Sequence, residues 1–152
     1  MDFATIFRLE ENLNLDKKTL VFLRWIAMSG QLFSVNLVFF YLDLNFPVLL
    51  CHLVIFAGLI TNIYLQFGVK ATLLKDLYST SFLMYDILQL SILLFLTGGI
   101  FNPFAILLIV PTIVSSTFLS MGSTIILGSS TIFLLFVLTF FNMPLPGMEE
   151  YV

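Results

Sequence analysis

Residues 80–119 read TSFLMYDILQLSILLFLTGGIFNPFAILLIVPTIVSSTFL, which is two apolar runs separated by Gly98-Gly99-Ile100-Phe101-Asn102-Pro103-Phe104. Each run is long enough for a membrane-spanning helix, which needs roughly 20 mostly apolar residues to cross about 30 Å of hydrocarbon. Neither run alternates apolar and polar residues as the strands of a membrane β-barrel do. The stretch therefore predicts two transmembrane helices joined by a short turn, which we call the 98–104 heptad.

The whole chain has the composition of an integral membrane protein. Of its 152 residues, 60% are apolar and 10% are charged, and the mean hydropathy is +1.10. A soluble core of this size cannot hide so much apolar surface. We therefore predict an all-α integral membrane protein, built as a bundle of five transmembrane helices. The predicted spans lie at about 20–41, 47–66, 80–97, 103–119 and 122–141.

The N-terminal region carries no secretory signal, because Asp2, Glu10 and Glu11 stand where a basic start is expected. Residues 1–19 are predicted to form a cytoplasmic segment that precedes a transmembrane domain at 20–141. Within the segment, apolar residues at helical spacing allow a short helix in the headgroup region over 2–13. A solvated tail is the alternative.

The basic residues predict the orientation in the membrane. They stand in two groups, one at the start of the first span and one between the second and third spans: Arg8, Lys17, Lys18, Arg24, Lys70 and Lys75. Five alternating spans place both groups on the same face, which is cytoplasmic by the positive-inside rule. The 98–104 heptad and the C-terminal residues 142–152 are then predicted to lie on the outer side of the membrane.

The sequence contains no motif for catalysis. It lacks a phosphate-binding Gly-rich loop, a Cys/His cluster of metal-ligand spacing and a nucleophile elbow. Cys51 is alone, so it forms no disulfide within this chain, and it is predicted to be buried in the second span. We expect neither a metal nor a nucleic-acid partner. A sensing or binding unit, a small transporter subunit and a structural scaffold remain as alternatives.

Polar residues inside the spans form two stripes. Asp86, Gln89 and Thr97 follow one face of the third span, and Arg24 and Gln31 share a face of the first span. An ionisable group in hydrocarbon costs at least about 2.5 kcal/mol, so such residues face the bundle interior or carry function. Arg24 is predicted to reach Asp86. The pair either joins the two helices, or Asp86 has a proton or ligand role.

Other residues have more local predicted roles. His52 in the second span is either a hydrogen-bonding residue between helices or a proton or ligand site. Pro111 is predicted to kink the fourth span, because it removes a backbone donor. Asp76 is placed to act as the N-cap of the third span, and Trp25 to anchor the first span at the interface. The connection at 120–123 is short, so the fourth and fifth spans are predicted to be antiparallel neighbours.

The 98–104 heptad has the residues of a helical hairpin. Gly98 and Gly99 tolerate the left-handed conformation that ends a helix, Asn102 is a strong N-cap, and Pro103 suits the first helical position. A plain turn therefore explains most of the heptad but not its two phenylalanines. The alternative is an amphipathic pocket, in which backbone donors and the Asn102 amide bind a polar head while the aromatic rings stack on a flat ligand such as a quinone.

The block from Tyr85 to Pro111 resembles the membrane domain of the RegB/PrrB/ActS redox-sensing histidine kinases. The resemblance rests on YDILQL at 85–90, LTGGIFNPFA at 96–105 and IVP at 109–111, together with LRWIA at 23–27 and PLP at 144–146. That family has a Gly-Gly-x-x-Asn-Pro-Phe heptad on an outer connection between the third and fourth of six spans, and this heptad is its proposed ubiquinone site. The matching residues here are Gly98, Gly99, Asn102, Pro103 and Phe104.

The resemblance implies a membrane sensor domain in which ubiquinone at the heptad controls a kinase domain that lies outside this chain. It also implies a sixth span following residues 142–152, a homodimer formed through the kinase part, and a cognate response regulator. His52 and Cys51 lie in the second span, so they are not the phosphorylated His and the redox-active Cys of that family. The implied quinone contacts and candidate polar partners are Gly98, Gly99, Phe101, Asn102, Pro103, Phe104, His52, Asp86, Gln89 and Arg24.

Overall fold

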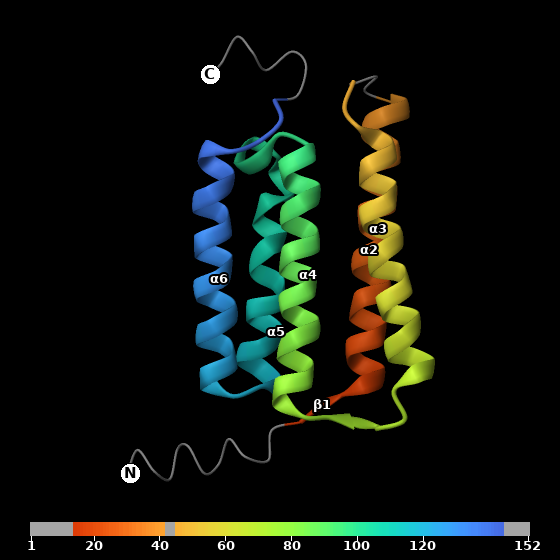
Figure 1. Cartoon of the computed structure of the whole chain (residues 1–152), viewed down its shortest axis with the longest axis vertical. Helices are drawn as coiled ribbons and strands as arrows, with labels where there is room; N and C mark the ends of the chain where they lie inside the picture. Colours follow the sequence, from red (N-terminus) through yellow and green to blue (C-terminus); the bar gives the residue numbers. More distant parts are fainter. Residues whose placement is uncertain (1–13, 42–44, 145–152) are drawn as a thin grey trace.

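The computed structural model describes residues 14–41 and 45–144, which form a bundle of parallel and antiparallel helices (Figure 1). The helical segments in chain order are α2 (Lys17–Tyr41), α3 (Val48–Ile63), the π-helix η1 (Tyr64–Gly68), α4 (Asp76–Leu96), the 3-10 helices η2 (Gly99–Phe101) and η3 (Pro103–Ile109), α5 (Val110–Phe118) and α6 (Met121–Phe140). This confirms the predicted all-α membrane fold. The interfacial helix considered for 2–13 lies outside the described residues.

Four helical segments of the described chain are long and apolar enough to cross a membrane. They are Lys17–Tyr41, Val48–Gly68, Asp76–Leu96 and Met121–Phe140, and a shorter apolar helix covers Pro103–Phe118. These five segments correspond to the five predicted spans. The largest difference in boundary is at the third span, which begins at Asp76 instead of residue 80.

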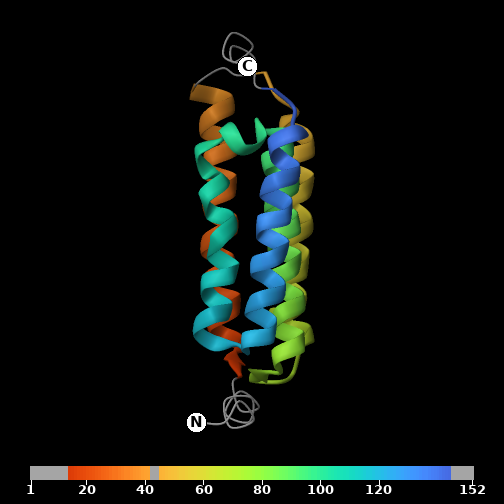
Figure 2. The same cartoon turned by 90° about the vertical axis from the view of Figure 1, so that its left-hand side faces the viewer.

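Helix α4 is the central element of the bundle. It packs against α3 on one side and against α5 and α6 on the other, while α2 packs on α3. Figures 1 and 2 show α2 and α5 on one side of the bundle, with α3 and α4 on the other. Half of an 18-residue apolar stretch of α4 is buried inside the bundle, compared with 22% of the corresponding stretches of α2 and α6. A core of leucine and isoleucine side chains surrounds α4 and includes Ile87, Leu94, Leu108 and Leu127.

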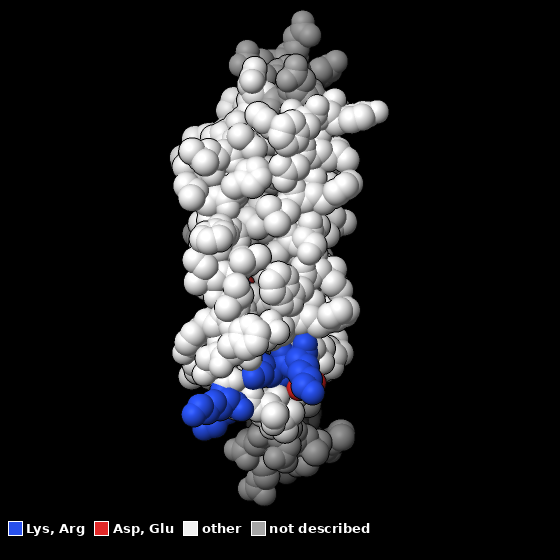
Figure 3. All heavy atoms as spheres, turned by 90° about the vertical axis from the view of Figure 1, so that its right-hand side faces the viewer, with Lys and Arg blue, Asp and Glu red and all other residues white. Residues whose placement is uncertain are grey.

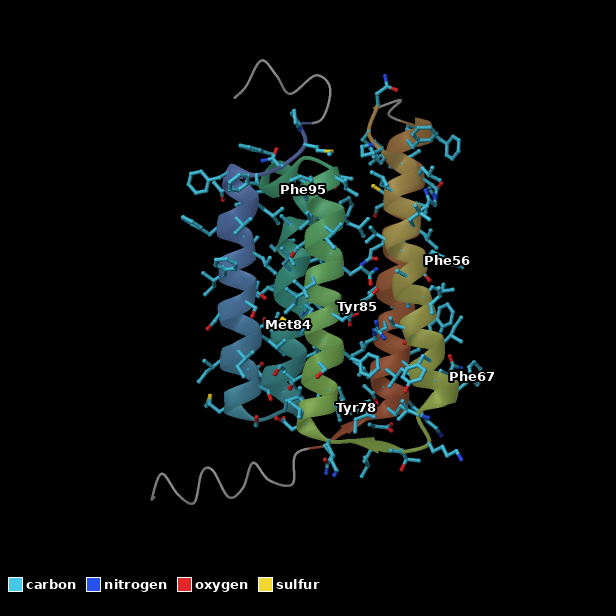
Figure 4. All side chains as sticks on the ribbon, viewed as in Figure 1. Phe56, Phe67, Tyr78, Met84, Tyr85 and Phe95 are labelled. Carbon is cyan, nitrogen blue, oxygen red and sulfur yellow. The ribbon has the colours of Figure 1, made fainter. Side chains whose placement is uncertain are left out.

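The described Lys side chains gather at one end of the bundle, which we call the basic end. They are Lys17, Lys18, Lys70 and Lys75. On the face formed by α2 and α3, the surface away from this end is free of Lys and Arg among the residues drawn (Figure 3). Large exposed apolar side chains such as Phe56 lie there instead (Figure 4). The opposite end carries the 98–104 heptad, and we call it the heptad end.

A small sheet closes the basic end and was not predicted from the sequence. Strand β1 (Leu15–Asp16) pairs antiparallel with β2 (Leu73–Leu74), in the connection between η1 and α4. The Lys17 Nζ donates to the carbonyl oxygens of Gln66 at 3.2 Å and Val69 at 2.6 Å. These carbonyls lie at the end of a helical segment, where a cation is favourable. The start of α2 is thereby fastened to the end of the α3–η1 helix.

The predicted N-cap role of Asp76 is wrong. Asp76 is the first residue inside α4, and the N-cap is Lys75. The Asp76 carboxylate instead accepts hydrogen bonds from the Ser120 N–H at 2.8 Å, from the Ser120 Oγ at 2.8 Å and from the Ser123 Oγ. The prediction failed because α5 and α6 are antiparallel neighbours, as expected, and their turn brings the donors of the α6 N-terminus beside α4. Asp76 therefore joins two helices at the basic end.

Pro111 marks a change of helix type and does not kink a continuous α-helix. It is the second residue of α5, directly after the 3-10 helix η3. Proline is tolerated in the first turn of an α-helix, since the N–H it lacks has no partner there. The Leu107 carbonyl accepts from the Val110 N–H. Cys51 is buried in α3, as predicted.

Candidate functional site

The 98–104 heptad forms the hairpin turn that its residues predict. Gly98 has φ +101° and Gly99 has φ +61°, so both adopt the left-handed region that favours glycine. The Asn102 Oδ1 accepts from the Phe104 N–H at 2.9 Å, and Pro103 is the first residue of η3. The turn therefore ends α4 and starts the next span within a few residues.

The Asn102 amide is used inside the turn. Its Nδ2 donates to the Thr97 carbonyl oxygen at 3.1 Å and to the Thr97 Oγ1 at 2.9 Å. A primary amide has two N–H donors, and these two bonds use both of them. Asn102 thus ties η3 to the end of α4. The Asn102 donor that the sequence suggested for a ligand is already engaged.

The chain that follows α6 packs over the heptad. A Cβ atom added at Gly99 would lie 2.4 Å from the Asn142 Cβ, so a larger residue has no space there. The Met143 N–H donates to the Phe95 carbonyl oxygen at 2.8 Å. The glycine at position 99 is therefore required both by its φ angle and by the close approach of Asn142.

A large cavity of about 730 Å³ lies between α2, α4 and the η3–α5 segment. Most of its lining is apolar and comes from α2 and α4, including Met28, Leu90 and Leu93. Three heptad residues line its end: Asn102, Pro103 and Phe104. Gly98, Gly99 and Phe101 are not among the lining residues, and the Phe101 side chain is 53% exposed. The last three residues of the heptad therefore form part of the cavity wall, whereas Gly98, Gly99 and Phe101 belong to the turn outside it.

The cavity also reaches an ion pair between Arg24 and Asp86. The Arg24 Nη2 lies 2.9 Å from the Asp86 Oδ1, and the Arg24 Nε donates to both carboxylate oxygens. The Nη2 also donates to the Thr61 Oγ1 on α3 at 2.8 Å. The Phe82 and Tyr85 rings lie 5.2 and 5.8 Å from the guanidinium carbon, and Figure 4 shows Tyr85 on the side of α4 that faces α2 and α3. The predicted pair is present, and it connects three helices.

A second polar pair lies farther along the cavity, between Gln31 on α2 and Gln89 on α4. The Gln89 Nε2 donates to the Gln31 Oε1 at 3.0 Å, and both residues line the cavity. Gln89 is 5% exposed and packs over Gly58 of α3. Sequence reasoning placed Gln31 on the face of Arg24 but did not join it to Gln89. The shared helical spacing of Arg24 with Gln31 and of Asp86 with Gln89 was the signal for this second contact.

Comparison with known proteins gives the family. Residues 8–150 match the family model of the PilS-like transmembrane domain, a six-helix type. The chain belongs to this family. RegB, a sensor histidine kinase of Cereibacter sphaeroides, is 38% identical to this PilS-like domain over 129 residues, which are 84% of this chain and 28% of RegB. A second RegB sequence from the same species is 38% identical over 75 residues, or 49% of this chain and 16% of that protein.

These matches confirm the resemblance stated from the heptad and its flanks. The matched part of the chain spans 28% of the length of the first RegB protein and 16% of the length of the second. No solved structure matches it. The PilS-like domain is a multi-pass membrane domain of the type found in sensor histidine kinases.

Two predicted residues of the PilS-like domain lie away from the cavity lining. The His52 Nδ1 lies 2.8 Å from the Val48 carbonyl oxygen of its own helix, so this contact joins neither α2 nor α4. The Trp25 Nε1 donates to the Gln66 Oε1 at 3.2 Å near the basic end. Of the candidate polar partners, the structure therefore brings Arg24, Asp86 and Gln89 to the cavity, whereas His52 is outside its lining.

Proposed function

We propose that this chain is the membrane sensor domain of a redox-responsive, two-component histidine kinase. In this proposal the domain binds ubiquinone in the cavity between α2, α4 and η3–α5, at the end formed by the 98–104 heptad. Binding then controls a kinase domain carried by another part of the protein. The observation that carries the proposal is the cavity of about 730 Å³ whose end wall is made by Asn102, Pro103 and Phe104.

The cavity fits a quinone in size and in chemistry. Ligand sites are typically about 300 to 1,000 Å³, mostly apolar, with a few polar groups that fix orientation. Here the Phe104 ring and the Leu107 side chain supply apolar wall. The polar side chains stand at a few positions along α2 and α4, including Arg24, Gln31 and Gln89. A quinone has a flat ring, carbonyl oxygens that accept hydrogen bonds, and a long hydrocarbon chain. Each part has a matching surface in the cavity.

The position of the cavity suggests how occupancy is communicated. Its walls belong to α2 on one side and to η3–α5 on the other, so a ligand between them changes how these spans pack. A ligand shifts a two-state equilibrium only by its difference in affinity for the two states, and a few kcal/mol are sufficient. The kinase part, a homodimer formed through it and a cognate response regulator are partners within this proposal.

The proposed orientation places the basic end in the cytoplasm of a bacterial cell and the heptad end on the outer side of the inner membrane. The support is the gathering of Lys17, Lys18, Lys70 and Lys75 at a single end of the described bundle. A quinone dissolved in the bilayer would then enter the cavity from the hydrocarbon.

Photolabelling in membranes tests the proposal. A ubiquinone analogue with a photoreactive group near the end of its hydrocarbon chain should label the peptide that contains η3, and unlabelled ubiquinone should compete. Replacing Phe101, Asn102 and Phe104 together with Ala should abolish the labelling. The single variants separate the two rings: Phe104→Ala should lower labelling more than Phe101→Ala, since only the Phe104 side chain lines the cavity. Unchanged labelling of the triple variant would refute binding at this site.

A further inference from the structure

The Gln31–Gln89 pair has hydrogen-bonding groups that are unpaired inside the cavity. One hydrogen bond joins the two side chains, from the Gln89 Nε2 to the Gln31 Oε1. Neither side-chain amide makes a further hydrogen bond to a described residue. Each primary amide has two N–H donors and one carbonyl acceptor. The pair therefore has at least one free N–H and one free carbonyl oxygen. If the oxygen and nitrogen positions of both amides are exchanged, Gln31 becomes the donor and Gln89 the acceptor, and the pair still has a free N–H and a free carbonyl oxygen.

Most other polar groups of the cavity are engaged, but the hydroxyl of Ser34, one turn from Gln31 on α2, makes no hydrogen bond with another described residue. Both N–H groups of Asn102 are bonded to Thr97. The Arg24 guanidinium is bonded to Asp86 and Thr61, and its remaining Nη1 atom has no partner but is fully buried. An amide without a partner is costly in an apolar environment. The Gln31–Gln89 pair, with Ser34 beside Gln31, is thus where the described cavity has unused hydrogen-bonding groups on its lining residues.

We propose that the Gln31–Gln89 pair binds the ring oxygen of the quinone. This inference rests on the proposed function and names the polar contact of its ligand. In the oxidised ligand, a ring carbonyl accepts a hydrogen bond from the free amide N–H. In the reduced ligand, a ring hydroxyl accepts the same bond and also donates to the free amide carbonyl.

Both redox forms are accommodated by this arrangement. The hydroxyl form can make a second hydrogen bond, but it also has a further polar group to remove from water or lipid headgroups.

The pair also fixes where the ring and the hydrocarbon chain lie. Gln89 is separated from Thr97 by eight positions on α4, which is about 12 Å along the helix axis. A ring held at Gln89 leaves the hydrocarbon chain to extend along the cavity to the heptad end, where Phe104 lines the wall. The Gln89 carboxamide is held against α3 at Gly58, because a Cβ atom at that position would lie 2.2 Å from the Gln89 Oε1.

The first test measures affinity for a short-chain ubiquinone and the corresponding ubiquinol, with the protein in phospholipid nanodiscs. Gln31→Met and Gln89→Met keep the side-chain length and remove the amide, and each should weaken binding of both forms about three- to tenfold. Gln66→Met is the matched control, because Gln66 bonds Trp25 outside the cavity lining. Gln31 is half-buried, so its variant tests the proposal even where Gln89→Met disturbs packing. Unchanged affinity of Gln31→Met would overturn it.

The second test locates the ring directly. A probe with its photoreactive group on the quinone ring should label α2 and α4 near Gln31 and Gln89, and a probe with the group near the end of the chain should label η3. The reverse pattern would overturn the role of the amide pair while leaving quinone binding intact. Absence of specific labelling by both probes would instead contradict the proposed function, and this inference with it.

Discussion

The guanidinium of Arg24 on α2 and the carboxylate of Asp86 on α4 form an ion pair in the membrane-spanning part of the bundle, with 2.9 Å between Nη2 and Oδ1. The Arg24 side chain is 4% exposed and that of Asp86 is 23% exposed. Neither charge is tolerated alone in hydrocarbon, so each makes the other acceptable. Through Thr61 the pair also includes α3, and it therefore holds α2 and α3 in place beside α4.

We expect Asp86→Asn to destabilise the domain by about 3 to 5 kcal/mol, because it leaves the buried Arg24 charge without its counter-ion. Thermal unfolding in nanodiscs, followed by Trp25 fluorescence, measures the change. The double variant Arg24→Leu/Asp86→Leu should recover much of the loss, since it removes both charges. Equal stability of Asp86→Asn and the wild type would contradict a structural role for the pair.

Gly58→Ala should destabilise the bundle by about 1 to 3 kcal/mol. The added methyl group would overlap with the Gln89 carboxamide, whose three outer atoms lie within 2.7 Å of its position. Gly30→Ala is the control, because nothing lies within 4 Å of a Cβ atom there and alanine favours a helix. The unfolding temperatures of the two variants should therefore move apart, and a similar value for both would show that α3 and α4 can separate at no cost.

Gly99→Ala should disturb the heptad turn for two independent reasons. Its φ of +61° is unfavourable for a residue with a Cβ atom, by about 1 to 2 kcal/mol, and the methyl group would meet Asn142 at 2.4 Å. Gly122→Ala adds the same group where the nearest atom is 3.8 Å away. The measurement is the rate at which a thiol reagent labels an introduced Asn142→Cys residue. This rate should rise when Gly99→Ala is added and stay unchanged when Gly122→Ala is added.

Asp76→Ala should loosen the basic end, because the N–H and hydroxyl donors of Ser120 and the hydroxyl of Ser123 lose their shared acceptor. Hydrogen bonds to a charged group contribute about 1.5 to 3 kcal/mol each at most, so a loss of several kcal/mol is expected. Asp16→Ala is the control, since the Asp16 carboxylate accepts a long bond of 3.4 Å from the Lys18 N–H. Hydrogen exchange at the start of α6 reports the effect. Equal protection in both variants would show that Asp76 does not hold the turn.

The sequence predicted the elements that depend on local chemistry. Apolar runs determine where a chain crosses hydrocarbon, and Gly98, Gly99, Asn102 and Pro103 each favour a backbone conformation found in the turn. The Arg24–Asp86 contact followed from two charges at similar depth that could not remain unpaired. These features need no knowledge of how the helices are arranged around one another.

The features that the sequence did not predict depend on that arrangement. Asp76 has the position of an N-cap, but the turn between α5 and α6 competes for its carboxylate and provides more donors. Asn102 has an amide suited to a ligand, but Thr97 lies close enough to engage it. The cavity itself arises because α2 and α5 are separated from each other. The residue pattern within a single span does not predict the distance between two helices.

The helix type of η3 decides how far its span reaches. A 3-10 helix rises about 2.0 Å per residue and an α-helix about 1.5 Å, so Pro103–Phe118 extends about 27.5 Å where a wholly α-helical segment of the same residues would extend about 24 Å. The stretched form is the one that approaches the thickness of the hydrocarbon layer, about 30 Å. Rewinding η3 into an α-helix would shorten this wall of the cavity by about 3.5 Å and turn its side chains around the helix axis. The length of the span beside the cavity is therefore set by the helix type of η3 as well as by the number of its residues.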